Sequence, residues 1–239
     1  MTRKKGGVMV SIISLGGSIV APDGVDTEFV SRFIRLIQTY TGEAGGEERK
    51  VILIVGGGGP ARKYQQAYRN IVDNPIHDDQ DWIGIMATRL NAELIRAGFA
   101  GLCLNPVVTD PSAEFEFTGS VLVAAGWKPG FSTDFDAVML AERFNARRII
   151  NLSNIEQVYT ADPKLDPNAR PLDQVSWSEF REMVGDEWTP GKNLPFDPVA
   201  TRKAADMGME VIAAGGRDLS NIQAVLEGRE FFGTRIGPG

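Results

Sequence analysis

The chain has 239 residues, of which 43% are hydrophobic and 23% charged, so it is long enough to bury one large core. Its net charge is −6 and its longest basic block is Arg3-Lys4-Lys5, so we expect no nucleic-acid partner. No apolar run approaches the roughly 18 residues that a membrane span needs, and we expect a cytoplasmic protein with no membrane partner. The single cysteine, Cys103, excludes an internal disulfide. The single histidine, His77, follows Asn74-Pro75 in a polar loop, so we expect neither a histidine metal cluster nor a Ser-His-Asp triad.

The first predicted element is a strand over Val8 to Leu15 that ends in the glycine turn Gly16-Gly17-Ser18. A helix follows, with Asp26 or Thr27 as its N-cap. Its apolar residues fall on one stripe, which comprises Phe29, Val30, Phe33, Ile34 and Ile37.

A second strand, Val51 to Val55, runs directly into the four glycines Gly56 to Gly59. Its β-branched and leucine residues suit a strand that is covered on both faces of a parallel sheet. Pro60 fits the first position of the next helix, so the glycines face a helix N-terminus, where free N–H groups favour an anion. Arg62 can add a forked contact to phosphate. We interpret this turn as a phosphate site. The alternatives are a tight turn without a ligand and, with low weight, a dinucleotide fold.

In the middle of the chain we predict a further helix, a short strand with an edge hairpin, and then a strand that is followed by a loop. The apolar residues of the helix, which ends near Gly98, are Trp82, Ile85, Met86, Leu90 and Leu94. Residues 100–108 read as a short strand and residues 110–117 as an edge hairpin. The strand over residues 121–125 leads to Ser132, Thr133 and Asp134, which can cap the helix that follows.

The C-terminal part continues the alternation of strands and helices. We predict strands over residues 148–152, 211–214 and 233–236, the last as an edge strand, and a long loop over residues 153–171. Helices are predicted after the capping box Ser176 to Glu179, after Asp197-Pro198, and over residues 221–226. Because no linker divides this pattern, we predict one α/β domain with a mainly parallel sheet between helices.

The ordered set of motifs resembles the amino acid kinase superfamily, and most closely its uridylate (UMP) kinases of the archaeal type. The match covers nearly the whole chain. Its motifs are Leu15 to Ser18, Val55 to Gly58 with Arg62, Asp81 to Ile85, Pro129 to Asp134, Val158 to Lys164 with Asp166-Pro167, Asp197-Pro198, and Gly233-Thr234.

The resemblance implies a three-layer α/β/α sandwich with an acceptor lobe over residues 1–145 and an ATP lobe over residues 146–239. It implies in-line transfer of the ATP γ-phosphate to UMP with Mg²⁺, no metal held by a dedicated set of protein ligands, and a homo-oligomer, a hexamer built as a trimer of dimers. Gly16, Gly17 and Asp197 would lie at the transferred phosphoryl group. The UMP residues would be Gly56, Gly57, Gly58, Arg62, Asp81, Ser132, Thr133 and Asp134. The ATP residues would be Ser18, Ser153, Asn154, Tyr159 and Asp162.

Three positions depart from the family pattern. Many relatives carry a lysine where this chain has Ser14, another lysine where it has Gly59, and Val-Asp-Gly-Val-Tyr where it has residues 155–159. We expect Lys192 to replace the lost charge at the catalytic site. Two other functions stay open: a kinase for another small phosphorylated or carboxylated acceptor, and a nucleotide-binding or oxyanion-binding storage protein with little turnover.

Several of these residues also have a purely structural interpretation. Asp81 and Asp197 can be helix caps, and Asp162-Pro163 can be a turn. Trp82 and Tyr159 can be core aromatic residues. The resemblance favours the functional interpretation of all five positions.

Overall fold

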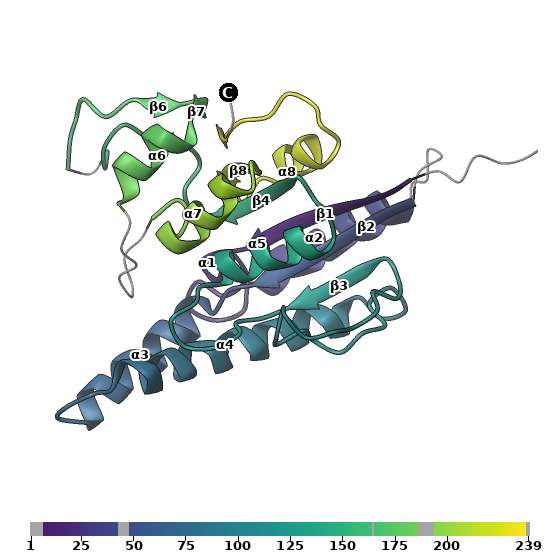
Figure 1. Ribbon diagram of the computed structural model, residues 1–239. Helices are drawn as coiled ribbons and strands as arrows, with labels where there is room; N and C mark the ends of the chain where they lie inside the picture. Colours follow the sequence, from purple (N-terminus) through teal and green to yellow (C-terminus); the bar gives the residue numbers. More distant parts are fainter. Residues whose placement is uncertain (1–6, 43–47, 164, 186–193, 238–239) are drawn as a thin grey trace, which may run out of the picture.

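The structure, a computed structural model, describes residues 7–42, 48–163, 165–185 and 194–237. Its centre is a seven-stranded sheet with the order β3-β2-β1-β4-β8-β9-β7 (Figure 1). The strands in chain order are β1 (Val8–Leu15), β2 (Glu48–Val55), β3 (Val121–Ala124), β4 (Arg148–Ser153), β7 (Gln174–Val175), β8 (Glu210–Gly215) and β9 (Thr234–Ile236). All neighbours from β3 to β8 are parallel, and β9 runs antiparallel to β8.

Strand β1 lies at the middle of this sheet, between β2 and β4. Ile12 of β1 is opposite Ile52 of β2 and Ile149 of β4, and all three side chains are fully buried. Continuous apolar runs form such strands because both faces of a parallel sheet are covered. The mainly parallel sheet predicted from the sequence is confirmed.

Helices cover both faces of the sheet, and each face has its own apolar core. On one side α1 (Gly17–Val20), α2 (Thr27–Gly42), α4 (His77–Gly98) and α8 (Leu219–Leu226) pack around Phe33. On the other side α5 (Thr133–Arg143), α6 (Trp177–Val184) and α7 (Pro198–Asp206) pack around Phe180. Burying one such side chain contributes roughly 1.5–3 kcal/mol. The three-layer sandwich is therefore confirmed. Helix α3 (Gly58–Ile71) packs on α4 at its outer side.

Several helix caps agree with the sequence. Asp26 accepts the Phe29 N–H at the start of α2, Ser176 and Glu179 form the predicted capping box of α6, and Asp197 caps α7 with Pro198 as its first residue. These local signals decide the helix starts because each cap binds a first-turn N–H that has no partner inside the helix.

Two predicted helix starts are wrong. Helix α3 begins at Gly58 and not at Pro60, because Gly58 takes the left-handed φ of +63° that lets the chain turn into the helix. Helix α4 begins at His77 rather than at Trp82, with Asp78 and Asp79 in its first turn, where negative charge stabilises a helix. Asp81 is therefore inside α4 and is not its N-cap.

The strand and hairpin predicted over residues 100–117 are wrong: within these residues the structure forms only two isolated bridges, Cys103 with Gly119 and Val108 with Ala124. Residues 153–171 were expected to form one loop. Instead, part of this segment pairs as a two-stranded antiparallel hairpin of β5 (Val158–Tyr159) and β6 (Pro171–Leu172). Strand β9 is not an edge strand, because β7 lies outside it. In the described part of the chain no helix is both long and apolar enough to cross a membrane.

Candidate active site

The two glycine turns meet at the carboxyl edge of the central strands. Gly16 follows β1 and donates its N–H to Leu152 of β4 at 2.8 Å, while Gly56 follows β2 and donates to Leu15 of β1 at 2.9 Å. These bonds continue the pairing of the strands beyond their ends. They fix both turns against the sheet and against each other.

The backbones of the two turns are in direct contact. A β-carbon on Gly17 would lie 2.0 Å from the nitrogen of Gly58, and one on Gly56 would lie 2.5 Å from the nitrogen of Gly17. In the described residues no backbone carbonyl accepts from the N–H groups of Gly17, Ser18, Gly57 and Gly58. Two adjacent turns with open N–H groups at helix starts are suited to anionic oxygens.

Arg62 is the fifth residue of α3, just after its first turn, because the helix begins at Gly58 and not at Pro60. Its guanidinium is exposed and donates to the carbonyl of Pro22 at 3.1 Å, so this side chain reaches from α3 to the segment that joins α1 and α2. The neighbouring Gly59 has no room for a side chain, because its β-carbon would lie 2.1 Å from the Pro22 oxygen. A lysine at position 59 does not fit this backbone.

A buried polar chain joins the first strand to two helix starts. Ser14, at the end of β1, donates through Oγ to Oδ1 of Asp134 at 2.9 Å, and Asp134 Oδ2 accepts the backbone N–H of Asp197 at 3.2 Å. Ser14 and Asp197 are only 2% and 7% exposed. The structure thus brings together three positions that lie far apart in the sequence, one of which, Ser14, is two residues before Gly16.

The carboxylates of Asp134 and Asp197 have no cationic partner among the described side chains that contact them. Burial raises the pKa of Asp134 to about 6, against the hydrogen bond from Ser14, and the charge of Asp197 raises it further. Burial also raises the pKa of Asp197, while the N–H groups of Ala200 and Val199 lower it. Asp197 Oδ1 accepts from Ala200 at 2.7 Å, but Oδ2 is buried without a hydrogen-bond donor.

The third strand leads into a loop over residues 126–132 that begins α5. Ser132 is the N-cap, and its Oγ accepts the Phe135 N–H at 3.2 Å, while Thr133 and Asp134 are the first two helical residues. Asp81 of α4 accepts the Gly130 N–H through Oδ2 at 3.0 Å. Four of the predicted UMP residues therefore lie in this loop, directly after it or in contact with it: Asp81, Ser132, Thr133 and Asp134.

The predicted ATP-side residue Ser153 ends β4 and Asn154 follows it, at the same edge of the sheet. They line a cavity of about 210 Å³ together with Glu156, Phe232 and the segment after β8, residues 215–218 and 221. Gly216 donates its N–H to the Ser153 carbonyl at 2.8 Å. The sequence analysis did not predict that residues 215–218 line this cavity. Gly215-Gly216 nevertheless follows a predicted strand, which is the same strand-then-glycine pattern as in the first two turns.

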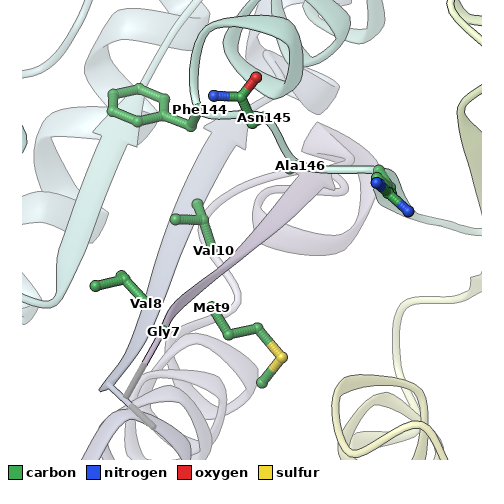
Figure 2. A pocket seen from close by; sticks show the side chains of 8 residues that line it. Gly7, Val8, Met9, Val10, Phe144, Asn145 and Ala146 are labelled. Carbon is green, nitrogen blue, oxygen red and sulfur yellow. The ribbon is translucent and has the colours of Figure 1, made fainter. Parts of the chain in front are cut away.

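Tyr159 lies in β5, where it pairs with Pro171 of β6, and Asp162 lies in the connection between these two strands. No described contact joins either side chain to the glycine turns. Lys192, the expected replacement for the missing charge, lies outside the described residues. A larger cavity of about 300 Å³ lies at the opposite, amino end of β1 and is lined by residues 7–10 and 144–147 (Figure 2). It shares no residue with the predicted sites.

Two polar residues of α4 that sequence reasoning missed hold the backbone of the turns that follow β2 and β3. Asn91 is 3% exposed and donates through Nδ2 to the carbonyls of Gly56 and Gly57, at 2.9 and 3.2 Å. Thr88 Oγ1 accepts the Gly126 N–H at 2.9 Å. The sequence does contain a signal for them: Thr88 and Asn91 are three residues apart, on the helix face that also carries the buried residues Ile85, Ala92 and Ile95.

The two glycine turns face each other at the carboxyl edge of the sheet, and their open N–H groups suit phosphate oxygens. The fold and the site therefore define the class as α/β proteins that bind phosphate groups. The model of the amino acid kinase family matches residues 9–214, so the chain belongs to the amino acid kinase family.

Named relatives agree with this assignment. The uridylate kinase of Methanospirillum hungatei is 33% identical over 94% of this chain and 93% of its own length. That of Methanocorpusculum labreanum is 33% identical over 95% and 94%. The crystal structure of uridylate kinase from Archaeoglobus fulgidus superimposes with a TM-score of 0.80 at 30% identity, covering 96% of this chain and all of that one. A UMP kinase structure from Bacillus anthracis, at 18% identity and a TM-score of 0.74, shows the shared fold.

Proposed function

We propose that this protein is a UMP kinase, which transfers the γ-phosphate of ATP to UMP and releases UDP and ADP. The observation that carries the proposal is the pair of glycine turns in backbone contact, each with N–H groups that no backbone carbonyl occupies among the described residues. One turn for the donor phosphates and one for the acceptor phosphate would place two anionic groups next to each other. The archaeal relatives with 30–33% identity are uridylate kinases, which supports UMP as the acceptor.

In this proposal the acceptor lies in the lobe of residues 1–145. Gly56, Gly57 and Gly58 bind the UMP phosphate through backbone N–H groups, and Arg62 leaves the Pro22 carbonyl to add a forked contact. Asp81 binds the ribose, and the segment from Ser132 to Asp134 contacts the base and phosphate. The position of all these groups around one strand edge supports the assignment.

ATP lies in the lobe of residues 146–239, with Ser153 and Asn154 at the cavity after β4 and with Tyr159 and Asp162 in the hairpin region. Gly16, Gly17 and Ser18 then meet the γ-phosphate. A UMP phosphate oxygen attacks the γ-phosphorus directly and ADP leaves on the opposite side. The residues of this chain align the two phosphates and neutralise their charge, and Lys192 remains a predicted contributor.

The residues beneath the γ-phosphate fit Mg²⁺. The described residues contain no cluster of three or more metal-binding side chains, but Mg²⁺ often binds one or two carboxylates together with substrate phosphates. Asp197 offers one buried oxygen, Oδ2, with no hydrogen-bond donor, so it is the residue that would hold the ion. When bound with ATP, Mg²⁺ neutralises charge on the transferred phosphoryl group.

The test is a screen of acceptors with Mg-ATP, in which ADP release is followed for UMP, CMP, AMP and small carboxylated acceptors. We expect UMP to give the highest kcat/KM, and Arg62→Met to raise the KM for UMP about 10-fold because a charged hydrogen bond to phosphate is lost. A better acceptor than UMP would favour the first alternative function. Tight binding of UMP and ATP without ADP release would favour the storage protein.

We further propose that the protein works in the cytoplasm as a hexamer built as a trimer of dimers. Four apolar residues on one face of α4 are exposed in the single chain: Trp82 by 43%, Met86 by 57%, Leu90 by 72% and Leu94 by 43%. Their spacing of four residues makes a continuous stripe, hereafter the α4 stripe. A second copy packed about a two-fold axis would bury it on both chains at once.

A further inference from the structure

The peptide groups of Gly126 and Trp127 are held by side chains from two helices. The Gly126 N–H donates to Thr88 Oγ1 at 2.9 Å, and the Trp127 N–H donates to Asp136 Oδ2 at 3.2 Å. Arg89 donates through Nε to the Gly126 carbonyl at 3.4 Å and through Nη2 to the Trp127 carbonyl at 3.0 Å. All four backbone polar groups of the two residues are therefore bound from α4 and α5.

The same loop is fixed to α4 a second time, where Asp81 accepts the Gly130 N–H. Arg89 and Asp81 are eight residues apart on α4, about two helical turns, so both attachments come from one side of the helix. The loop carries Trp127 at the first attachment and Phe131 directly after the second. Their ring centroids are 5.2 Å apart, and the Phe131 centroid lies 4.6 Å from that of Phe135 in α5. The aromatic side chains are thus fixed together with the backbone.

Arg89 makes two of these hydrogen bonds and is their only cationic donor. A guanidinium presents several N–H donors in a rigid fork, which suits two successive carbonyls, and charged hydrogen bonds are stronger than neutral ones. Its charge also faces Asp136, which is 1% exposed and whose Oδ1 has no hydrogen-bond partner. Asp110 and Asp134 are the other charged groups that act on Asp136. Asp136 and Arg89 hold the same residue, because Asp136 accepts the Trp127 N–H and Arg89 donates to the Trp127 carbonyl.

We propose that Arg89 is a positioning residue for the acceptor: it fixes the loop over residues 126–132 and thereby sets the affinity for UMP. This inference rests on the proposed function, which assigns the end of this loop to the acceptor. Arg89 acts through the Gly126 and Trp127 carbonyls and does not touch the acceptor. Removing it frees the loop and weakens acceptor binding, while the ATP side is unchanged.

The test compares Arg89→Met, Arg89→Lys and Arg96→Met with the wild type. Arg96 is a matched control on the same helix, because its guanidinium binds only the exposed Glu93 among the described residues. For Arg89→Met we expect the KM for UMP to rise about 10-fold, a size typical of charged hydrogen bonds, with kcat and the KM for ATP within about 3-fold. Arg89→Lys keeps one donor and should recover part of the loss, and Arg96→Met should match the wild type.

Hydrogen exchange of the ligand-free protein, read by mass spectrometry, supplies a readout that needs no turnover. In Arg89→Met the peptide covering residues 126–132 should exchange about 10-fold faster, since local opening becomes easier, while the peptide covering residues 51–58 is unchanged. Wild-type exchange in this loop would overturn the proposal. So would faster exchange without a change in the KM for UMP. A raised KM with unchanged exchange would mean that Arg89 touches the acceptor itself, which also contradicts it.

Two further outcomes are decisive. If Arg89→Met does not fold, the same comparison is made between Arg89→Lys and Arg96→Met, and wild-type exchange and KM in Arg89→Lys then overturn the proposal. If the wild type phosphorylates no UMP, the proposed function fails, and hydrogen exchange still decides whether Arg89 holds the loop.

Discussion

Gly17 and Gly58 are in backbone contact: a β-carbon on Gly17 would lie 2.0 Å from the Gly58 nitrogen, and one on Gly58 would lie 2.2 Å from the Gly17 oxygen. The glycine turn after β1 and the glycine turn after β2 therefore touch without any side chain between them. This contact explains why so many glycines occur here, since Gly56 and Gly59 are also closely packed against neighbouring backbone. It also brings two sets of N–H groups close enough to serve two phosphates that react with each other.

We predict that Gly17→Ala destabilises the protein strongly, on the order of 4 kcal/mol, because the new methyl group meets rigid backbone rather than a flexible side chain. Urea unfolding measures this change. The control is Gly24→Ala, whose β-carbon would meet nothing within 4 Å, and which should unfold within about 1 kcal/mol of the wild type. Equal stability of the two variants would show that the turns can separate at little cost.

Asp197→Asn should lower kcat about 100-fold or more, a size typical of losing a charged group that stabilises a phosphoryl transition state. Asparagine is as good an N-cap as aspartate, so the unfolding free energy should change little and α7 should remain. The control is Ser176→Asn, which alters the N-cap of α6 and should keep full activity. A kcat for Asp197→Asn near that of the wild type would reduce Asp197 to a helix cap.

The burial of Asp136 predicts that stability falls as pH rises. Burial raises the pKa of Asp136 from 3.8 to about 7, and the neighbouring carboxylates Asp134 and Asp110 add to this. The folded protein therefore binds more protons than the unfolded chain between these values, so the unfolding free energy decreases as pH rises through about 4 to 7. A difference of one between the folded and unfolded pKa corresponds to about 1.4 kcal/mol of unfolding free energy.

Urea unfolding at about pH 5.5 and about pH 8 should show this decrease in the wild type and a smaller one in Asp136→Asn. The pKa of Asp26 is lowered, mainly by the Phe29 N–H, so its titration falls below this range. Asp26→Asn should therefore keep the wild-type slope. The same slope in all three proteins would mean that Asp136 does not titrate in this range.

Leu90→Glu should break the assembly, because it puts a charge at the centre of the α4 stripe, where Leu90 is 72% exposed in the single chain. Light scattering after gel filtration should show a smaller species than the wild type. Met207→Glu is the control, since Met207 is 37% exposed but lies after α7, away from the stripe. A monomeric wild type would contradict the proposed hexamer directly.

The sequence predicted those parts of the fold in which local and tertiary effects agree. Strands β1 and β2 follow from unbroken apolar runs, and α7 follows from Asp197-Pro198, because the cap and the fixed proline φ act within a few residues. The start of α4 was missed because its apolar pattern begins only at Trp82, while its first residues, His77 to Asp81, are all polar.

The hairpin predicted over residues 110–117 failed for a different reason. Phe115 and Phe117 do alternate with acids, and both rings pack on Phe144. Their backbone, however, is held by side chains: Arg143 donates to the Phe115 carbonyl at 3.0 Å, and Asn105 donates to the Glu116 carbonyl at 2.7 Å. Hydrogen bonds from distant side chains to the backbone produce no periodic pattern in the sequence, so they could not be predicted from it.

The candidate site was predicted as a set of turns, but its connections were not. The bond from Ser14 to Asp134 joins residues 120 positions apart, and no local pattern links them. Likewise Arg89 and Asp136 meet only because α4 and α5 flank the same loop. Sequence reasoning found the residues that follow strands and missed the polar residues inside helices that hold them in place.

Direct transfer between the two nucleotides can be observed by ³¹P NMR of the purified protein with Mg²⁺, ATP and UMP in equal amounts. We expect ADP and UDP to appear together in a one-to-one ratio. Omitting UMP should abolish ADP formation, because the γ-phosphate passes straight to the acceptor. ATP breakdown that does not depend on UMP, or no change in either nucleotide, would contradict the proposed phosphoryl transfer.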